Sequence, residues 1–170
     1  MTAALADSLA QRAWKVLEAI PDPEIPVVSI RELGILREIN DHSGQLEVVI
    51  TPTYSACPAM AQIEQDVRAA LDASGLPATV VTRLAPAWST DWISEAGKAK
   101  LRDFGIAPPH ALPANVVQFA RHVPGKFETV HCPHCGSDNT TETSHFSSTA
   151  CKALYKCLAC LEPFDYFKPY

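Results

Sequence analysis

The sequence predicts a small α/β domain, in which helices pack on a three-stranded mixed sheet, followed by a C-terminal four-cysteine zinc ribbon. Three observations support this fold class. Apolar residues alternate between helical and strand-like spacing up to about residue 104, prolines then interrupt the chain, and two Cys-x-x-Cys pairs follow near the C-terminus. We therefore expect an α/β domain over residues 1–107, a proline-containing linker over 108–124 and a metal module over 125–170.

The first half of the domain is predicted to contain one helix and a hairpin. Apolar residues with helical spacing indicate a helix over about residues 7–20, which ends where three closely spaced prolines remove amide donors and fix φ. A strand is expected after Gly34, up to about Ile39. Residues 41–44 then read as a turn, and residues 46–51 alternate as the second strand of a β-hairpin.

The second half continues with helix, strand and helix. An apolar stripe predicts a helix over about residues 60–71, and alternation predicts a third strand over 80–84. A further helix is expected over about residues 93–104, with Gly105 as the residue that ends it. Trp88 and Trp92 precede this helix. We expect them to pack in the core or at a domain interface, with a partner surface as the alternative.

Four cysteines in the tail have the spacing of a metal site. Zn²⁺ binds four thiolates in a tetrahedron, and a two-residue spacer lets both sulfurs of one pair turn onto the same ion. The predicted ligands are Cys132, Cys135, Cys157 and Cys160. Zn²⁺ is the expected metal, although iron suits the same sulfur cage. A module of this size lies near the limit below which a protein needs a metal or disulfides to fold.

Other interpretations of these cysteines are less favoured. Disulfides need an oxidising compartment, but residues 1–30 show no signal-peptide pattern, which predicts a cytoplasmic location and reduced thiols. His131, His134 or His145 could replace a ligand, but four cysteines already saturate the site. The second pair is less regular than the first, because Leu161 follows it where Gly136 follows the first pair.

Composition narrows the function classes. With 170 residues, 47% of them hydrophobic, the chain can hold a compact domain of about 100 residues and an appended module. Its formal net charge of −5 argues against nucleic acid, which binds clusters of basic side chains. No apolar run approaches the roughly 18 residues of a membrane span. A soluble protein is expected, and a nucleic-acid-binding ribbon is disfavoured.

Cys57 is the candidate functional thiol outside the tail. Pro58 follows it, and proline favours the first helical position, so the sequence predicts that Cys57 is the N-cap of the helix. There the helix dipole would lower its pKa and stabilise the thiolate. The alternative is an ordinary buried cysteine. Asp22 and Glu24, in a proline-rich turn, are candidates for the wall of the same site, with a solvated loop as the alternative.

Cys151 is a sixth cysteine outside the four predicted ligands. Its spacing leaves three roles open: a spare structural thiol, a ligand of a second metal species or cluster, and a redox-exchange partner.

Several motifs resemble known proteins. Over about residues 8–104 the chain resembles the α/β domain of SufT-like iron–sulfur assembly proteins, and with the ribbon and residues 146–157 the whole chain resembles the PaaD family linked to the bacterial phenylacetyl-CoA 1,2-epoxidase. The motifs in the first part are Asp22-Pro23-Glu24, residues 29–35, residues 51–58 and Pro86-Ala87-Trp88.

The resemblance implies a non-catalytic accessory protein of aerobic phenylacetate catabolism. It would help to insert a cluster into the iron–sulfur reductase component, with the iron–sulfur assembly machinery as a further partner. Cys57 would be the functional thiol, Asp22 and Glu24 its acidic companions, and a transient iron–sulfur cluster or iron its cargo. A purely structural subunit of the oxygenase complex is the alternative. Self-association is left open.

Overall fold

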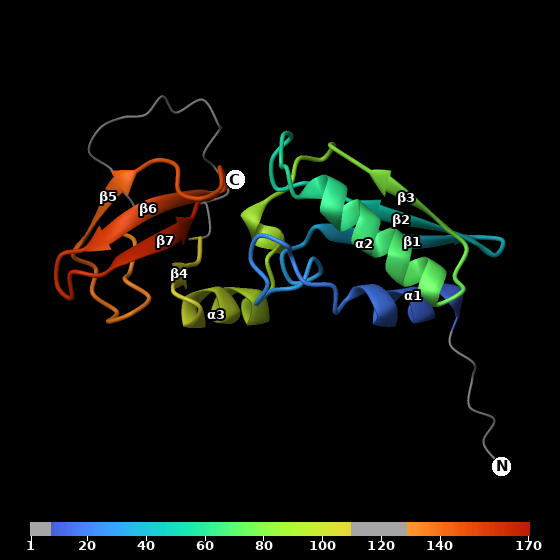
Figure 1. Ribbon diagram of the computed structural model, residues 1–170, viewed down its shortest axis with the longest axis horizontal. Coiled ribbons are helices and arrows are strands. Elements are labelled where there is room, and N and C mark those ends of the chain that lie inside the picture. Colours follow the sequence, from blue (N-terminus) through green and yellow to red (C-terminus); the bar gives the residue numbers. More distant parts are fainter. Residues whose placement is uncertain (1–7, 110–128) are drawn as a thin grey trace, which may run out of the picture. The chain divides into compact units, whose positions relative to one another are not determined.

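The computed structural model describes residues 8–109 and 129–170, and the chain divides into two units, each with its own sheet (Figure 1). The first, here the α/β unit, extends to Gly97 but excludes Ser89–Asp91. The second, here the ribbon unit, contains Ser89–Asp91 and Lys98–Tyr170.

The α/β unit contains the predicted mixed sheet. Strands β1 (Leu36–His42) and β2 (Gln45–Ile50) form the expected antiparallel hairpin, and β3 (Ala78–Thr82) pairs with β2 in parallel. The central strand β2 is therefore hydrogen-bonded on both sides, in the order β1-β2-β3. Its last three residues are almost completely buried, which makes this strand the centre of the apolar core.

Two helices pack on this sheet, as Figure 1 shows for α2. Helix α1 (Leu9–Leu17) begins with a capping box, in which the Ser8 hydroxyl and the Gln11 side chain satisfy each other's backbone amides. Helix α2 (Met60–Ala73) buries residues of the predicted stripe. Helix α1 contacts α2 and β1, and α2 contacts β3, so the expected packing of helices on a three-stranded sheet is confirmed.

The two tryptophans before the third helix, Trp88 and Trp92, belong to the α/β unit. Trp88 is 5% exposed, and its indole N–H donates to the Leu33 carbonyl at 3.0 Å, so it is a core residue. Trp92 ends the short helix η1 (Thr90–Trp92), and the Arg37 guanidinium lies 3.4 Å from its ring centre. A Cβ on Gly34, which has a φ of 72°, would come within 2.6 Å of the Trp92 Cβ, so only glycine fits there.

Helix α3 (Glu95–Asp103) ends as predicted. Gly105 adopts a φ of 86°, and its amide donates to the Arg102 carbonyl at 3.0 Å. Glycine tolerates this left-handed conformation, and the chain therefore turns sharply into the next strand.

The ribbon unit holds a four-stranded sheet, in the order β4-β7-β6-β5. Strand β7 pairs in parallel with β4 and antiparallel with β6, and β6 is antiparallel to β5. The strands are β4 (Ile106–Ala107), β5 (Thr140–Ser144), β6 (Lys152–Cys157) and β7 (Pro163–Phe167).

The ribbon sheet begins before the domain boundary that the sequence predicts after residue 107. Strand β4 pairs with Asp165 and Tyr166 of β7, so residues 106 and 107 belong by hydrogen bonding to the ribbon sheet. A two-residue strand has no pattern of its own in the sequence, and only its partner reveals it. Residues 108 and 109 follow it, and the remainder of the predicted linker lies outside the described residues.

The ribbon has a larger apolar core than its length suggests. Buried aromatic side chains from β6 and β7, Tyr155, Phe164 and Tyr166, pack with two of the cysteines, Cys132 and Cys157. The metal-binding sulfurs are thus continuous with the hydrophobic core, so metal and core stabilise the same structure.

In the described parts of the chain, no helix is both long enough and apolar enough to cross a membrane.

Candidate functional site

The four tail cysteines converge as predicted. Their sulfur atoms all lie within 4.8 Å of one another, with Cys132 and Cys160 separated by 3.7 Å and Cys135 and Cys157 by 3.6 Å. Four sulfurs at about 2.3 Å from a central Zn²⁺ would be about 3.8 Å apart, by tetrahedral geometry. The sulfur positions therefore fit one tetrahedral metal ion.

Neither of the alternative uses of these cysteines is present. All six cysteines are free thiols, and separations of 3.6 and 3.7 Å are far longer than a disulfide bond of about 2.05 Å. In the described residues, His131, His134 and His145 do not join the four-sulfur group. An all-sulfur donor set suits zinc or iron.

Backbone amides favour the thiolate form within this group. The amides of Cys160 and Ala159 each donate to the Cys157 sulfur at 3.4 Å. Together with the thiols of Cys160 and Cys135 they lower the pKa of Cys157 to about 6, whereas burial and the three neighbouring thiols raise the pKa of Cys160 to about 12. Because a metal binds thiolate rather than thiol, this turn prepares one ligand before the metal arrives.

The turn after the second cysteine pair forms without glycine. Gly136 has a φ of 76° after the first pair, and Leu161 adopts nearly the same φ, 70°, at the matching position of the second. The left-handed region costs a non-glycine residue about 1–2 kcal/mol. The second turn therefore has nearly the same backbone conformation as the first. It differs only in that Leu161, a non-glycine residue, bears the strain of the left-handed region. Its side chain is 65% exposed.

Cys57 does not occupy the predicted N-cap. Helix α2 begins at Met60, and its N-cap is Ala59, which makes no side-chain capping bond. Cys57 lies in the preceding turn, where its amide donates to the Tyr54 carbonyl at 3.1 Å and its own carbonyl accepts from the Met60 amide at 3.3 Å. The prediction of an N-cap thiol is wrong, because Pro58 begins a turn that precedes the helix.

The predicted direction of its pKa is also wrong. Burial raises the pKa of the Cys57 thiol, and the charges of Asp22 and Glu24 raise it further. The Ala59 amide and the Thr53 hydroxyl act in the opposite direction by hydrogen bonding to the sulfur, without reversing the shift. The resting thiol is therefore protonated near neutral pH.

The proline-rich turn fixes the carboxylate of Asp22. This residue is 5% exposed, and its Oδ1 accepts hydrogen bonds from the amides of Glu24 at 2.9 Å and Ile25 at 2.8 Å. Its own amide donates to the Val28 carbonyl at 2.9 Å, which closes the turn. The carboxylate of Asp22 is thus buried and held in place by backbone amides, whereas Glu24 is exposed. Sequence spacing does not reveal that either one acts on Cys57, since this depends on the tertiary fold.

Cys151 lies apart from the four-sulfur group. It is 8% exposed, its sulfur is 3.1 Å from the Thr149 hydroxyl, and its carbonyl accepts from the Lys168 amide at 2.9 Å. This environment suits the structural thiol among its three predicted roles, and the roles as a cluster ligand or exchange partner stay predictions.

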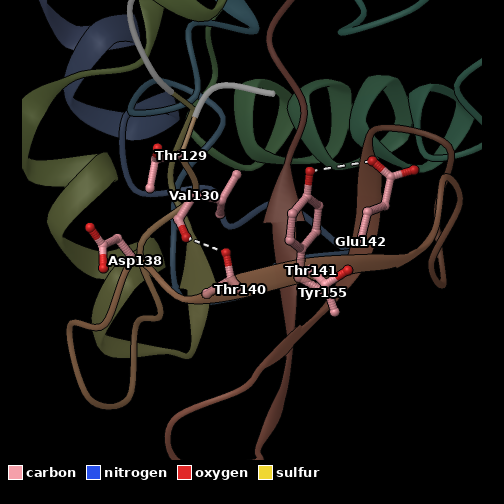
Figure 2. Close-up of a pocket in the computed structure, with 7 residues that line it drawn as sticks. All are labelled: Thr129, Val130, Asp138, Thr140, Thr141, Glu142 and Tyr155. Atoms are coloured by element: carbon pink, nitrogen blue, oxygen red, sulfur yellow. Dashed lines mark hydrogen bonds between the residues drawn. The ribbon is translucent and has the colours of Figure 1, made fainter. Parts of the chain in front are cut away.

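A cavity of about 300 Å³ opens in the ribbon unit, and none of the cysteines is among its described lining residues (Figure 2). Two of its hydroxyls already have partners: Thr140 donates to the Val130 carbonyl at 2.6 Å, and Tyr155 donates to Glu142 at 3.3 Å. Burial, with the charge of Glu142, raises the pKa of Tyr155 to about 12. These bonds stabilise the ribbon, and the cavity contains no predicted site residue.

Comparisons with known proteins agree with both halves of this description. Residues 10–83 match the family described as iron–sulfur cluster assembly protein, and residues 118–168 match the PaaD zinc beta ribbon domain. A crystal structure of the domain of unknown function DUF59 from Bacillus anthracis is 28% identical, with a TM-score of 0.50, and covers 55% of this chain and 91% of its own. The fold and site thus define an iron–sulfur assembly domain joined to a metal-binding ribbon.

A relative of nearly full length identifies the family. Over 167 residues the chain is 42% identical to an Escherichia coli (strain K12) protein provisionally named as the D component of 1,2-phenylacetyl-CoA epoxidase, with 98% of this chain and 96% of that protein covered. This chain belongs to the same family, the PaaD family.

Proposed function

We propose that this protein is a non-catalytic maturation factor of the phenylacetyl-CoA 1,2-epoxidase system, which presents Cys57 to iron or to an iron–sulfur cluster. The name of the relative supports the epoxidase system, and the match of residues 10–83 supports the assembly role. The iron–sulfur reductase component is the proposed client, and the iron–sulfur assembly machinery is the proposed source of the cargo.

The observation that carries this proposal is a half-buried thiol under the influence of two carboxylates. A nucleophilic cysteine needs a base or a positive charge beside it. Among the described groups that shift the pKa of Cys57, the charged ones are Asp22 and Glu24, which oppose ionisation. An iron cation bound here would favour ionisation of the thiol, because its positive charge attracts the thiolate and both carboxylates. The surroundings favour cation binding over nucleophilic catalysis.

The ribbon has a different part in this proposal. Its four sulfurs hold one Zn²⁺ permanently, and the metal shapes the surface that the client contacts. Cys57 holds its cargo only in passing, since one protein thiol with carboxylates is a weaker set of ligands for soft metals than four thiols.

A cellular experiment with Cys57→Ala tests the assembly role. We expect epoxidase activity and the cluster content of the reductase component to fall, while the amount of the variant protein in the cell is unchanged. Cys151→Ala is the comparison variant, because Cys151 lies apart from the four-sulfur group, and an equal loss there would favour its predicted role as a cluster ligand or exchange partner. If the Cys57→Ala strain retains normal activity and a fully loaded reductase, the assembly role is wrong and the purely structural role is favoured.

A further inference from the structure

A second cavity of the ribbon unit, of about 530 Å³, lies beside the first Cys-x-x-Cys turn. Lys98 and Arg102 of α3, residues 107–109 after the helix, and residues 131–133 with Gly136 form its walls. None of these residues belongs to the Cys57 site. Its volume lies in the range of about 300–1,000 Å³ that is typical of small-molecule sites.

Two permanently basic side chains, Lys98 and Arg102, line this cavity. His131 lines it as well, and no acidic residue is among the described lining residues. Lys98 and Arg102 are four residues apart, so they project from the same face of α3. Both side chains can therefore donate hydrogen bonds to one anion that enters the cavity.

The composition of the walls indicates which anion fits. A guanidinium and an ammonium group suit phosphate, which accepts paired hydrogen bonds from arginine. Ala107, Pro108, Pro109 and Pro133 add apolar wall. We propose that this cavity binds a phosphorylated small molecule, with Lys98 and Arg102 at the phosphate and the prolines against its apolar part. This inference is independent of the proposed role of Cys57.

Another explanation makes these basic residues counter-charges of the metal centre. Cys132 lines the cavity, and four thiolates around one Zn²⁺ carry a net charge of about −2. In that case, the substitution of Lys98 or Arg102 would weaken metal retention and leave no phosphate site to detect. The two explanations therefore differ in a measurable way.

Isothermal titration of the full-length, metal-loaded protein with pyrophosphate and with adenosine diphosphate tests the proposal. Because a hydrogen bond to a charged group contributes about 1.5–3 kcal/mol, we expect Lys98→Gln and Arg102→Gln each to weaken binding by about tenfold or more. Lys100→Gln is the matched control, since Lys100 lies on the same helix but does not line the cavity, and its affinity should stay within about twofold. The nucleotide should bind more tightly than pyrophosphate because its base contacts the prolines.

Four results would overturn the proposal. The first is no heat of binding for either probe at millimolar concentration. The second is an equal loss of affinity in Lys100→Gln, which would place the site elsewhere. The third is loss of zinc from Lys98→Gln and Arg102→Gln in place of loss of phosphate binding. The fourth is tighter binding of a hexaglutamate peptide than of both probes, which would identify an acidic protein segment as the occupant.

Discussion

The two thiol sites of this chain differ in the groups that surround their sulfur atoms. In the ribbon, four sulfurs approach one another and backbone amides lower the pKa of Cys157. In the α/β unit, a single sulfur is half-buried near carboxylates, and burial with these charges raises the pKa of Cys57. One site brings four sulfurs together and favours the thiolate form of one of them, Cys157. The other favours a neutral thiol until a cation is present.

This difference suits two different lifetimes of binding. A preformed tetrahedron of soft ligands holds a metal tightly, and its binding energy becomes folding energy. A protonated thiol must release its proton before it binds a cation, so that affinity is lower and depends on pH. The ribbon is therefore suited to a resident ion, and Cys57 to cargo that has to leave.

Removal of the ribbon metal should have the largest effect. Structural zinc contributes an apparent 10–16 kcal/mol or so in small modules, so chelation or Cys132→Ser should unfold the ribbon unit and leave the α/β unit folded. Circular dichroism and limited proteolysis with metal analysis measure this. Cys151→Ser is the control and should retain the metal, because Cys151 is outside the four-sulfur group. A metal-free ribbon that stays resistant to protease would show that its aromatic core suffices.

The alkylation rate of Cys57 should rise at a higher pH than that of an activated thiol, whose pKa is lowered. Because burial and two carboxylates raise its pKa, alkylation of Cys57 should have its midpoint above the usual value of about 8.5 for a free thiol. The protonated thiol adds stability that is complete below about pH 8.5 and is lost as the pH rises through the higher pKa of the folded state. Mass spectrometry of the peptide containing Cys57 follows the reaction.

Asp22→Asn should lower this midpoint, because it removes a charge while its side-chain oxygen can still accept the amides of Glu24 and Ile25. Asp72→Asn is the matched control, since Asp72 is an exposed carboxylate near the end of α2. Ferrous iron should protect Cys57 from alkylation in the native protein and less well in Asp22→Asn. Equal protection of both proteins would exclude Asp22 from the cation site.

Thr53→Val should change the same site in the opposite direction and by less. The Thr53 hydroxyl hydrogen-bonds to the sulfur and lowers the pKa of Cys57, but its contribution is smaller than that of the Asp22 charge. Valine has almost the same shape, so the substitution removes the hydrogen bond and keeps the buried volume. We expect slower alkylation of Cys57 at a fixed pH. Faster alkylation would show that the hydroxyl stabilises the neutral thiol.

The sequence was a better guide to the ribbon metal site than to the Cys57 site, for a physical reason. The two cysteines of a Cys-x-x-Cys turn are close in the sequence, so their spacing alone predicts that the sulfurs converge. The periodicity of helices and strands also depends on residues that are close in the sequence. The surroundings of Cys57 are set by residues such as Asp22 that are distant in the chain, and Pro58 was a misleading sign of a helix start. Strand β4 was missed because only β7 defines it.

The two turns of the ribbon offer the smallest effects. Gly136→Ala places a side chain at a φ of 76° in open space, so only backbone strain should act, and we expect a loss of about 1 kcal/mol in ribbon stability.

Leu161→Gly relieves the same strain at a φ of 70° but makes the unfolded chain more flexible, which offsets part of the gain. A net stabilisation below about 1 kcal/mol should follow, seen as slower zinc transfer to a competing chelator. If Leu161→Gly releases zinc faster than the native protein, the exposed leucine side chain contributes to the stability of the turn and strain does not explain its behaviour.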